Sequence, residues 1–272
     1  MRKYFSQQSE RSIASWRATV RRMGDLQSER DGSLLILTMA KGKANALNQA
    51  LVEEMCAAVA TAAKDESIRG LVLASGCPRF FSSGFDIREV FTYDRDVMAA
   101  FFGGFIDLYE GLYRFPKPTV AALSGHTFAG GAILALACDF RIMAEGNFGF
   151  ALNEIDLGLI PPPTVLRMLM GAVGTARGRE ILLFGKPLTA ARALEIGLVR
   201  ELPPAEQVRE QAIACARLLA SKPPHAYRES KRLLGELGDA VRASDRAVLD
   251  EFLKVWFSAE AQEARQAVAA KL

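Results

Sequence analysis

Two glycine-centred turns in this sequence have a composition that could stabilise a negative oxygen. The first is Phe80–Ile87 and the second is Ser124–Ala132. Each follows a short apolar run and precedes a helical pattern, which predicts backbone N–H groups at a helix N-terminus, where negative charge is favoured. Two such N–H groups aimed at one point would form an oxyanion hole. From spacing alone, tight turns without a ligand explain the glycines more simply.

An acidic segment follows these turns. Phe150–Pro161 places Glu154 and Asp156 among apolar residues. A carboxyl group with few polar neighbours has a raised pKa, which suits proton transfer near neutral pH. Taken alone, the segment is explained more simply by a helix cap or a structural ion pair. The segments do not match nucleotide-binding motifs, because neither a G-x-G-x-x-G turn that opens a helix nor a Gly-Lys-Ser/Thr loop is present.

Composition sets the frame for these segments. The chain has 272 residues, 50% of them hydrophobic and 24% charged, and a net charge of +3. These values are typical of a soluble globular enzyme and argue against nucleic acid as a partner. No apolar run reaches the roughly 20 residues of a membrane-spanning helix. The four cysteines are scattered and there are two histidines, so we expect reduced thiols and no metal.

The order of apolar and polar residues predicts the elements that position the site. Up to about residue 200, buried strands alternate with helices, which indicates an α/β layer fold with mostly parallel strands. Strands are expected at residues 34–39, 68–74, 119–123, 140–144 and 148–151. Helices are expected at 51–62, where Asn48 can cap the N-terminus, at 96–113 and at 130–137.

Three regions are predicted along the chain. Residues 1–25 form a basic arm or helix, residues 26–203 form the α/β core, and residues 204–272 contain only helices. Helices are expected there at 205–220, 223–237, 240–257 and 259–272, as an oligomerisation or lid element. We expect a cytoplasmic protein, although the final tripeptide Ala270-Lys271-Leu272 would be a peroxisomal address in a eukaryote.

Taken together, the motifs resemble the crotonase family, also called the enoyl-CoA hydratase/isomerase family. The resemblance runs from about Leu34 to Ala220. It rests on several motifs in a consistent order, which are Lys41–Leu47, Ser83–Asp86, Gly125–Asp139, Asn153–Gly158, Gly185–Ala190 and Gly197–Val199.

The resemblance implies a fold, a substrate class and an assembly. The fold would be a spiral of ββα units, with C-terminal helices that form a homotrimer or a dimer of trimers. The substrate would be an acyl-CoA thioester, and no cofactor is expected because coenzyme A is part of the substrate. The N–H groups of Ser83 and Gly130 would hold the thioester oxygen, with Glu154 as acid/base. Further substrate-binding positions would be Ala44, Asn45, Leu47, Gly84, Phe85, Asp86, Ile87, Gly131, Ile133 and Pro162.

Two departures from the hydratases of this family narrow the prediction. Those enzymes carry two glutamates, but Ile133 stands at the position of the first, and Pro162 stands where they have glycine. Hydration needs a held and activated water, whereas moving a double bond from the 3,4 to the 2,3 position needs one base and an oxyanion hole. The chain is most similar to the single-glutamate delta-3,delta-2-enoyl-CoA isomerases, and isomerisation is the predicted reaction.

Two alternatives stay open at this point. One is an enoyl-CoA hydratase with an atypical site, in which Asp156 or another group replaces the missing glutamate. Asp156 would share a face with Glu154 on a strand but not on a helix. The other is a non-catalytic acyl-CoA-binding protein on the same scaffold. His126 precedes the second turn, and we expect it to be structural or to line the pocket.

Overall fold

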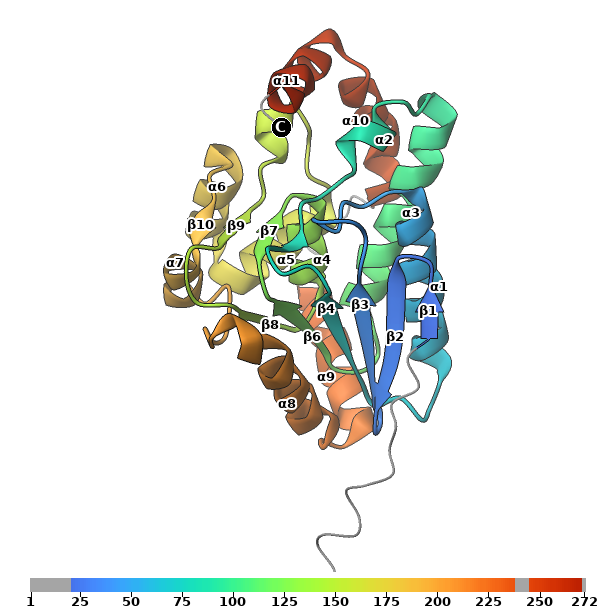
Figure 1. Ribbon diagram of the computed structural model, residues 1–272, viewed down its shortest axis with the longest axis vertical. Helices are drawn as coiled ribbons and strands as arrows, with labels where there is room; N and C mark the ends of the chain where they lie inside the picture. Colours follow the sequence, from blue (N-terminus) through green and yellow to red (C-terminus); the bar gives the residue numbers. More distant parts are fainter. Residues whose placement is uncertain (1–20, 238–244, 271–272) are drawn as a thin grey trace, which may run out of the picture.

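The computed structural model describes residues 21–237 and 245–270 (Figure 1). Strands and helices alternate along most of this chain, and the strands form two sheets. The larger sheet has the order β1 (Arg21–Met23), β2 (Leu26–Asp31), β3 (Leu34–Met39), β4 (Gly70–Ser75), β6 (Thr119–Leu123) and β8 (Phe140–Met143). The smaller sheet has the order β10 (Leu188–Thr189), β9 (Gly149–Ala151), β7 (His126–Phe128) and β5 (Phe80–Ser82).

The two sheets are joined by a spiral connection. Strands β4, β6 and β8 pair in parallel in the larger sheet, and each continues directly into β5, β7 or β9 of the smaller sheet, which also pair in parallel. One or two helices follow each pair of consecutive strands. After β5 come α2 (Ile87–Val90) and α3 (Arg95–Tyr113), after β7 comes α4 (Gly130–Ala137), and after β9 come η1 (Glu154–Leu157) and α5 (Pro163–Val173). The predicted α/β spiral of ββα units is confirmed.

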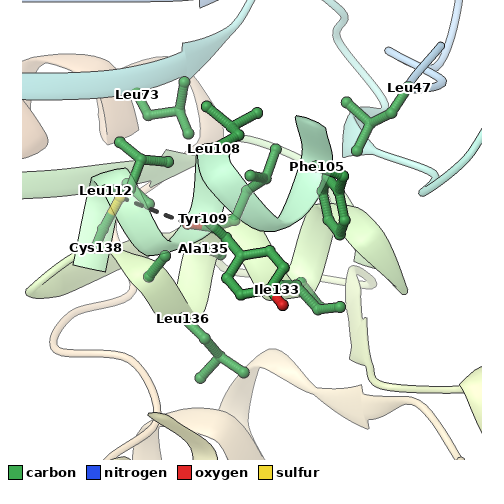
Figure 2. Close-up of a cluster of buried hydrophobic side chains, with 14 of the residues drawn as sticks. Leu47, Leu73, Phe105, Leu108, Tyr109, Leu112, Ile133, Ala135, Leu136 and Cys138 are labelled. Atoms are coloured by element: carbon green, nitrogen blue, oxygen red, sulfur yellow. Dashed lines mark hydrogen bonds between the residues drawn. The ribbon is translucent and has the colours of Figure 1, made fainter. Parts of the chain in front are cut away.

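Both faces of the larger sheet are covered, which explains its continuous apolar strands. In β3, Leu35 and Leu37 face the main core with α1 (Gln49–Lys64), α3 and α4, while Leu34 and Ile36 face α8 (Val208–Ala220). Figure 2 shows part of the main core, where Tyr109 of α3 lies beside Ile133 of α4. The core therefore holds α4, and with it the second glycine-centred turn, against α3.

The remaining helices are α6 (Thr175–Phe184), α7 (Ala190–Glu195), η2 (Ala205–Gln207), α9 (Pro224–Leu237), η3 (Asp245–Val248), α10 (Leu249–Trp256) and α11 (Ala259–Ala269). Figure 1 shows α10 and α11 at the end opposite α8 and α9. Phe252 of α10 stacks on Phe102 of α3 at 3.5 Å between ring centroids, so the last helices pack on the core.

Some predicted boundaries differ from the structure. Strand β2 was not expected, because its sequence Leu-Gln-Ser-Glu-Arg-Asp is polar and half-exposed beside β3. Residues 21–23 form a strand and not the end of a helix, while the predictions for residues 1–20 lie outside the described residues. Helix α10 begins at Leu249, later than the predicted start at residue 240. Residues 240–244 of that predicted helix and the last two residues of the final tripeptide lie outside the described residues. No helix in the described ranges is long and apolar enough to cross a membrane.

Candidate active site

A cavity of about 470 Å³ lies where the predicted segments meet. It is bounded by the turn after β5, the N-terminus of α4, helix η1, and the aromatic faces of α3 and α10. Its lining is mainly apolar, as expected for an acyl chain. The predicted residues that line it are Ala44, Ser83, Phe85, Asp86, Ile87, Gly130, Ile133, Glu154 and Pro162.

Glu154 is buried in the wall of this cavity. Its side chain is 8% exposed, and neither carboxylate oxygen has a hydrogen-bond partner among the described residues. Burial raises the pKa of Glu154 from 4.5 to about 7, because the apolar surroundings disfavour the charged form. A surface cap or a structural ion pair would have left the carboxylate exposed or paired. The structure therefore excludes both of the simpler interpretations of this residue.

Asp156 lies elsewhere. Glu154 and Asp156 belong to the 3₁₀ helix η1, in which successive side chains differ by about 120°, so the two carboxylates point in different directions. Asp156 is exposed, does not line the cavity and sits beside Gly185. It cannot share a water molecule with Glu154 in this arrangement.

The turn after β5 offers a different backbone donor from the one predicted. The N–H of Ser83 donates to the carbonyl of Ala44 at 3.0 Å, so it is already paired and the prediction for Ser83 as an oxyanion donor is wrong in this structure. Leu47 forms a parallel β-bridge with Phe85. The N–H of Leu47 donates to the carbonyl of Gly84, and the carbonyl of Leu47 accepts from the N–H of Asp86. In such a bridge the N–H of Phe85 points away from Leu47. No acceptor for it is found within the described ranges.

The second donor comes from the start of α4. Gly130 is the first residue of that helix, and its N–H has no acceptor in the part of the chain that the structure describes. Ala129 before it has φ +46°, a strained value for a residue with a side chain. The two turns touch, because a Cβ atom placed on Gly84 would lie 3.3 Å from the Gly130 nitrogen. The donors of Phe85 and Gly130 thus line one cavity from adjoining turns.

Four predicted positions support the site without lining the cavity. Asn45 is fully buried and fixes its own loop: its side chain accepts from the N–H of Lys41 and donates to Ser75 and to the carbonyl of Phe81. Leu47 is a core residue whose backbone pairs with the first turn.

Gly84 and Gly131 are required by close packing. Gly84 has φ +90°, and a Cβ atom there would lie 2.9 Å from Ala129. A Cβ atom on Gly131 would lie 2.6 Å from the Cβ of Ser82. These two glycines bring β5 and α4 together, so they shape the site and do not contact the cavity.

Two charged or titratable side chains near the site have structural partners. Asp86 lines the cavity but is held by Lys41 at 2.6 Å. His126 does not line the cavity; its Nδ1 accepts from the N–H of Gly149 at 3.0 Å, and its ring packs against Phe80. Burial and the nearby positive charge of Arg79 lower the pKa of His126, which favours the neutral ring.

Residues from the end of the chain also line the cavity, and the sequence motifs did not indicate them. Phe252, Trp256 and Arg265 come from α10 and α11. An apolar pattern in α10 predicts a buried face, but nothing in it indicates which surface that face covers. Further lining residues outside the predicted set are Ala46, Phe80, Arg88, Phe102, Phe105, Phe128, Ala129, Asn153, Leu157, Leu159 and Ile160.

No group of three or more His, Cys, Asp or Glu side chains that could hold a metal ion occurs among the described residues. What the site contains is a buried carboxyl group, two backbone donors on adjoining turns and an apolar cavity. These parts can remove and return a proton next to a carbonyl group whose oxygen becomes negative.

The spiral of ββα units with this kind of site defines a class of enzyme that acts on acyl thioesters. The family model for enoyl-CoA hydratase/isomerase matches residues 29–270, and the chain belongs to that family.

Relatives of two kinds match. The mitochondrial enoyl-CoA delta isomerase 1 of Mus musculus is 28% identical over 77% of this chain and 73% of its own length. The 2,3-dehydroadipyl-CoA hydratase of Escherichia coli is 33% identical over 78% of this chain and 82% of its own. The crystal structure of human mitochondrial delta3-delta2-enoyl-CoA isomerase superposes with a TM-score of 0.86 at 25% identity, covering 91% of this chain and 98% of the other. Because isomerases and hydratases share the family, the choice of reaction depends on the site.

Proposed function

We propose that this protein isomerises 3-enoyl-CoA to 2-enoyl-CoA with Glu154 as a single acid/base. The observation that carries the proposal is the buried carboxyl group of Glu154, which has no hydrogen-bond partner among the described residues and lines the same mainly apolar cavity as Ile133. The carboxylate takes a proton from C2 of the acyl chain, and the double bond shifts as the dienolate forms. The same carboxyl group then returns the proton at C4, so no water is consumed.

Two backbone donors stabilise the dienolate in this proposal. The N–H groups of Phe85 and Gly130 bind the thioester oxygen as it gains negative charge. Both lack acceptors among the described residues, and both belong to cavity-lining residues, which supports this pairing over the one with Ser83. The loop around Ala44 and the residues Asp86 and Ile87 would contact the coenzyme A part of the substrate.

The pKa of Glu154 supports a role in both proton transfers. With a pKa of about 7, the carboxyl group is ionised in about half of the molecules near neutral pH. It is basic enough to remove a proton and acidic enough to return it. A protein that only bound acyl-CoA would have no use for a buried charge without a partner, which is costly to stability.

Hydration is the second candidate, favoured by the name of the Escherichia coli relative. A hydratase needs a second polar group to hold the attacking water. Ile133 offers none, Asp156 faces elsewhere, and Asp86 is paired with Lys41. The geometry therefore favours isomerisation.

The test offers purified protein 3-enoyl-CoA and 2-enoyl-CoA separately, separates the products by liquid chromatography against standards of both isomers, and determines their mass. Isomerisation leaves the mass of the first substrate unchanged and moves its double bond. Rapid addition of water to the second substrate would instead establish a hydratase. Binding without turnover of either substrate would indicate the non-catalytic alternative.

We also propose that the chain assembles as a homotrimer or a dimer of trimers, in the cytoplasm. Large apolar side chains that one chain leaves exposed support assembly, among them Phe184 on α6 and Leu234 on α9. Sedimentation analysis of the full chain tests this proposal, and a monomer at micromolar concentration would contradict it.

A further inference from the structure

Arg265 is a buried cation in the wall of the same cavity as Glu154. It lies on α11, is 5% exposed, and lines the cavity together with Trp256. Its Nη2 donates to the carbonyl of Trp256, whereas its Nη1 is buried and has no hydrogen-bond partner in the described part of the chain. No ion pair joins it to a carboxylate of the described residues.

The guanidinium group is held in place on several sides. It lies 4.2 Å from the ring centroid of Trp256 and 5.5 Å from that of Phe91, so the flat group contacts two aromatic side chains. One turn earlier on the same helix face, Ala261 packs against Gly158 at the end of η1. The helix that carries Arg265 is thus fixed against the segment that carries Glu154.

A buried guanidinium with an unpaired N–H group is costly unless a ligand completes its hydrogen bonds. Burial lowers the pKa of Arg265, but the group stays protonated because guanidinium is a very weak acid. The charged groups that line the cavity besides Arg265 are Asp86, Arg88 and Glu154. Asp86 is paired with Lys41, and neither oxygen of Glu154 bonds to Arg265. The described residues that line the cavity therefore leave Nη1 of Arg265 able to bond a negative oxygen of a ligand.

We propose that Arg265 binds a carboxylate at the far end of the acyl chain, so that the preferred substrates are ω-carboxyacyl-CoA thioesters. This inference rests on the proposed function, because it takes the cavity to hold an acyl-CoA. A carboxylate matches the planar donors of arginine. The phosphates of coenzyme A are the other source of negative oxygen. They are multiply charged and strongly hydrated, and a side chain that is 5% exposed among aromatic rings suits the buried end of the acyl chain better.

The experiment measures binding of adipoyl-CoA and hexanoyl-CoA to the full-length protein by calorimetry. The two saturated thioesters have the same chain length and differ in the terminal carboxylate, and neither can be isomerised. We expect wild type to bind adipoyl-CoA at least about tenfold more tightly, as for a hydrogen bond to a charged group. Arg265→Met should abolish this preference, and Arg265→Lys should keep part of it, since it retains the charge but loses the planar donors.

Arg88→Met is the matched control, because Arg88 lines the cavity but is exposed. It should leave the preference for adipoyl-CoA intact. Each preference is a ratio measured on one protein, so a partly folded variant does not distort it. Equal binding of both thioesters by wild type would overturn the role of Arg265 and leave the isomerase proposal standing. Failure of both to bind would overturn the acyl-CoA site itself.

A second comparison distinguishes the two possible sources of the negative oxygen, which are the acyl carboxylate and the phosphates of coenzyme A. If Arg265 binds a phosphate of coenzyme A, Arg265→Met weakens both CoA thioesters equally and has no effect on the corresponding pantetheine thioesters. That result would overturn the proposal. If it binds the acyl carboxylate, the variant lowers the affinity for adipoyl-pantetheine as it does for adipoyl-CoA.

Discussion

Replacing Glu154 by glutamine should remove activity and at the same time stabilise the protein at alkaline pH. Glutamine has nearly the same shape but cannot accept or return a proton. General acid/base groups contribute about 10²- to 10⁴-fold to rate, so kcat for isomerisation should fall by at least about 100-fold. The backbone donors and the cavity are unchanged, so KM should change little.

The gain in stability follows from the pKa of the buried carboxyl group. The folded chain holds this proton with a pKa of about 7, against 4.5 for the ordinary side chain. Folding therefore favours the protonated form, and the contribution of Glu154 to the free energy of unfolding falls as pH rises from 4.5 to about 7. At 1.36 kcal/mol for each pH unit, the loss is about 3 kcal/mol. Glu154→Gln has no such loss.

The assay is urea denaturation of wild type and variant at several pH values. The difference in free energy of unfolding should be near zero at about pH 4 and should reach about 3 kcal/mol in favour of the variant at about pH 8. Asp156→Asn is the matched control, because this exposed carboxylate lies two residues away and outside the cavity. It should change neither activity nor stability by more than about 0.5 kcal/mol.

Two results would refute this reasoning. Full activity in Glu154→Gln would show that another group transfers the proton. Destabilisation of the variant at about pH 8 would show that the carboxylate has a stabilising partner, such as an ion pair, and that its pKa is not raised.

Three further predictions follow from the same site. In wild type, kcat/KM for a 3-enoyl-CoA should rise with pH and level off above about 7, because the ionised form of Glu154 removes the proton; a flat profile from pH 5 to 9 would contradict this. Ile133→Glu places a second carboxyl group in the cavity wall and should raise the ratio of hydration to isomerisation, measured on both substrates by liquid chromatography with mass detection. Gly131→Ala should destabilise the fold by about 1–3 kcal/mol in urea denaturation, because the added Cβ would lie 2.6 Å from the Cβ of Ser82. Gly171→Ala in α5 is the control. A Cβ atom there would have nothing within 4 Å, so this variant should be neutral or slightly stabilising.

Local patterns were sufficient to predict the central elements of the fold. The strand at 119–123 and the helix at 130–137 have the predicted bounds, because each is an apolar run limited by proline, glycine or polar residues. Strand β2 was not predictable in the same way. Its side chains are polar, and it becomes a strand because β3 presents an edge for it to pair with.

In the candidate site, the sequence likewise identified key residues but not their local conformation. Glu154 and Ile133 were identified from motifs in the sequence, and the cavity contains both. The conformation around Glu154 was not identified: η1 is a short 3₁₀ helix, and its geometry decides that Asp156 points away from the cavity.

By itself, the amino-acid sequence determined the family, the ββα spiral and the carboxyl group that can move a proton, because these depend on residue types at fixed spacings. Only the tertiary structure decided which backbone donors are available and what closes the cavity. The bridge between Leu47 and Phe85 leaves the N–H of Phe85 without an acceptor, whereas that of Ser83 is paired with Ala44. Arg265 reaches the cavity from more than 100 residues after Glu154, through packing of α11 on η1 that no local pattern specifies.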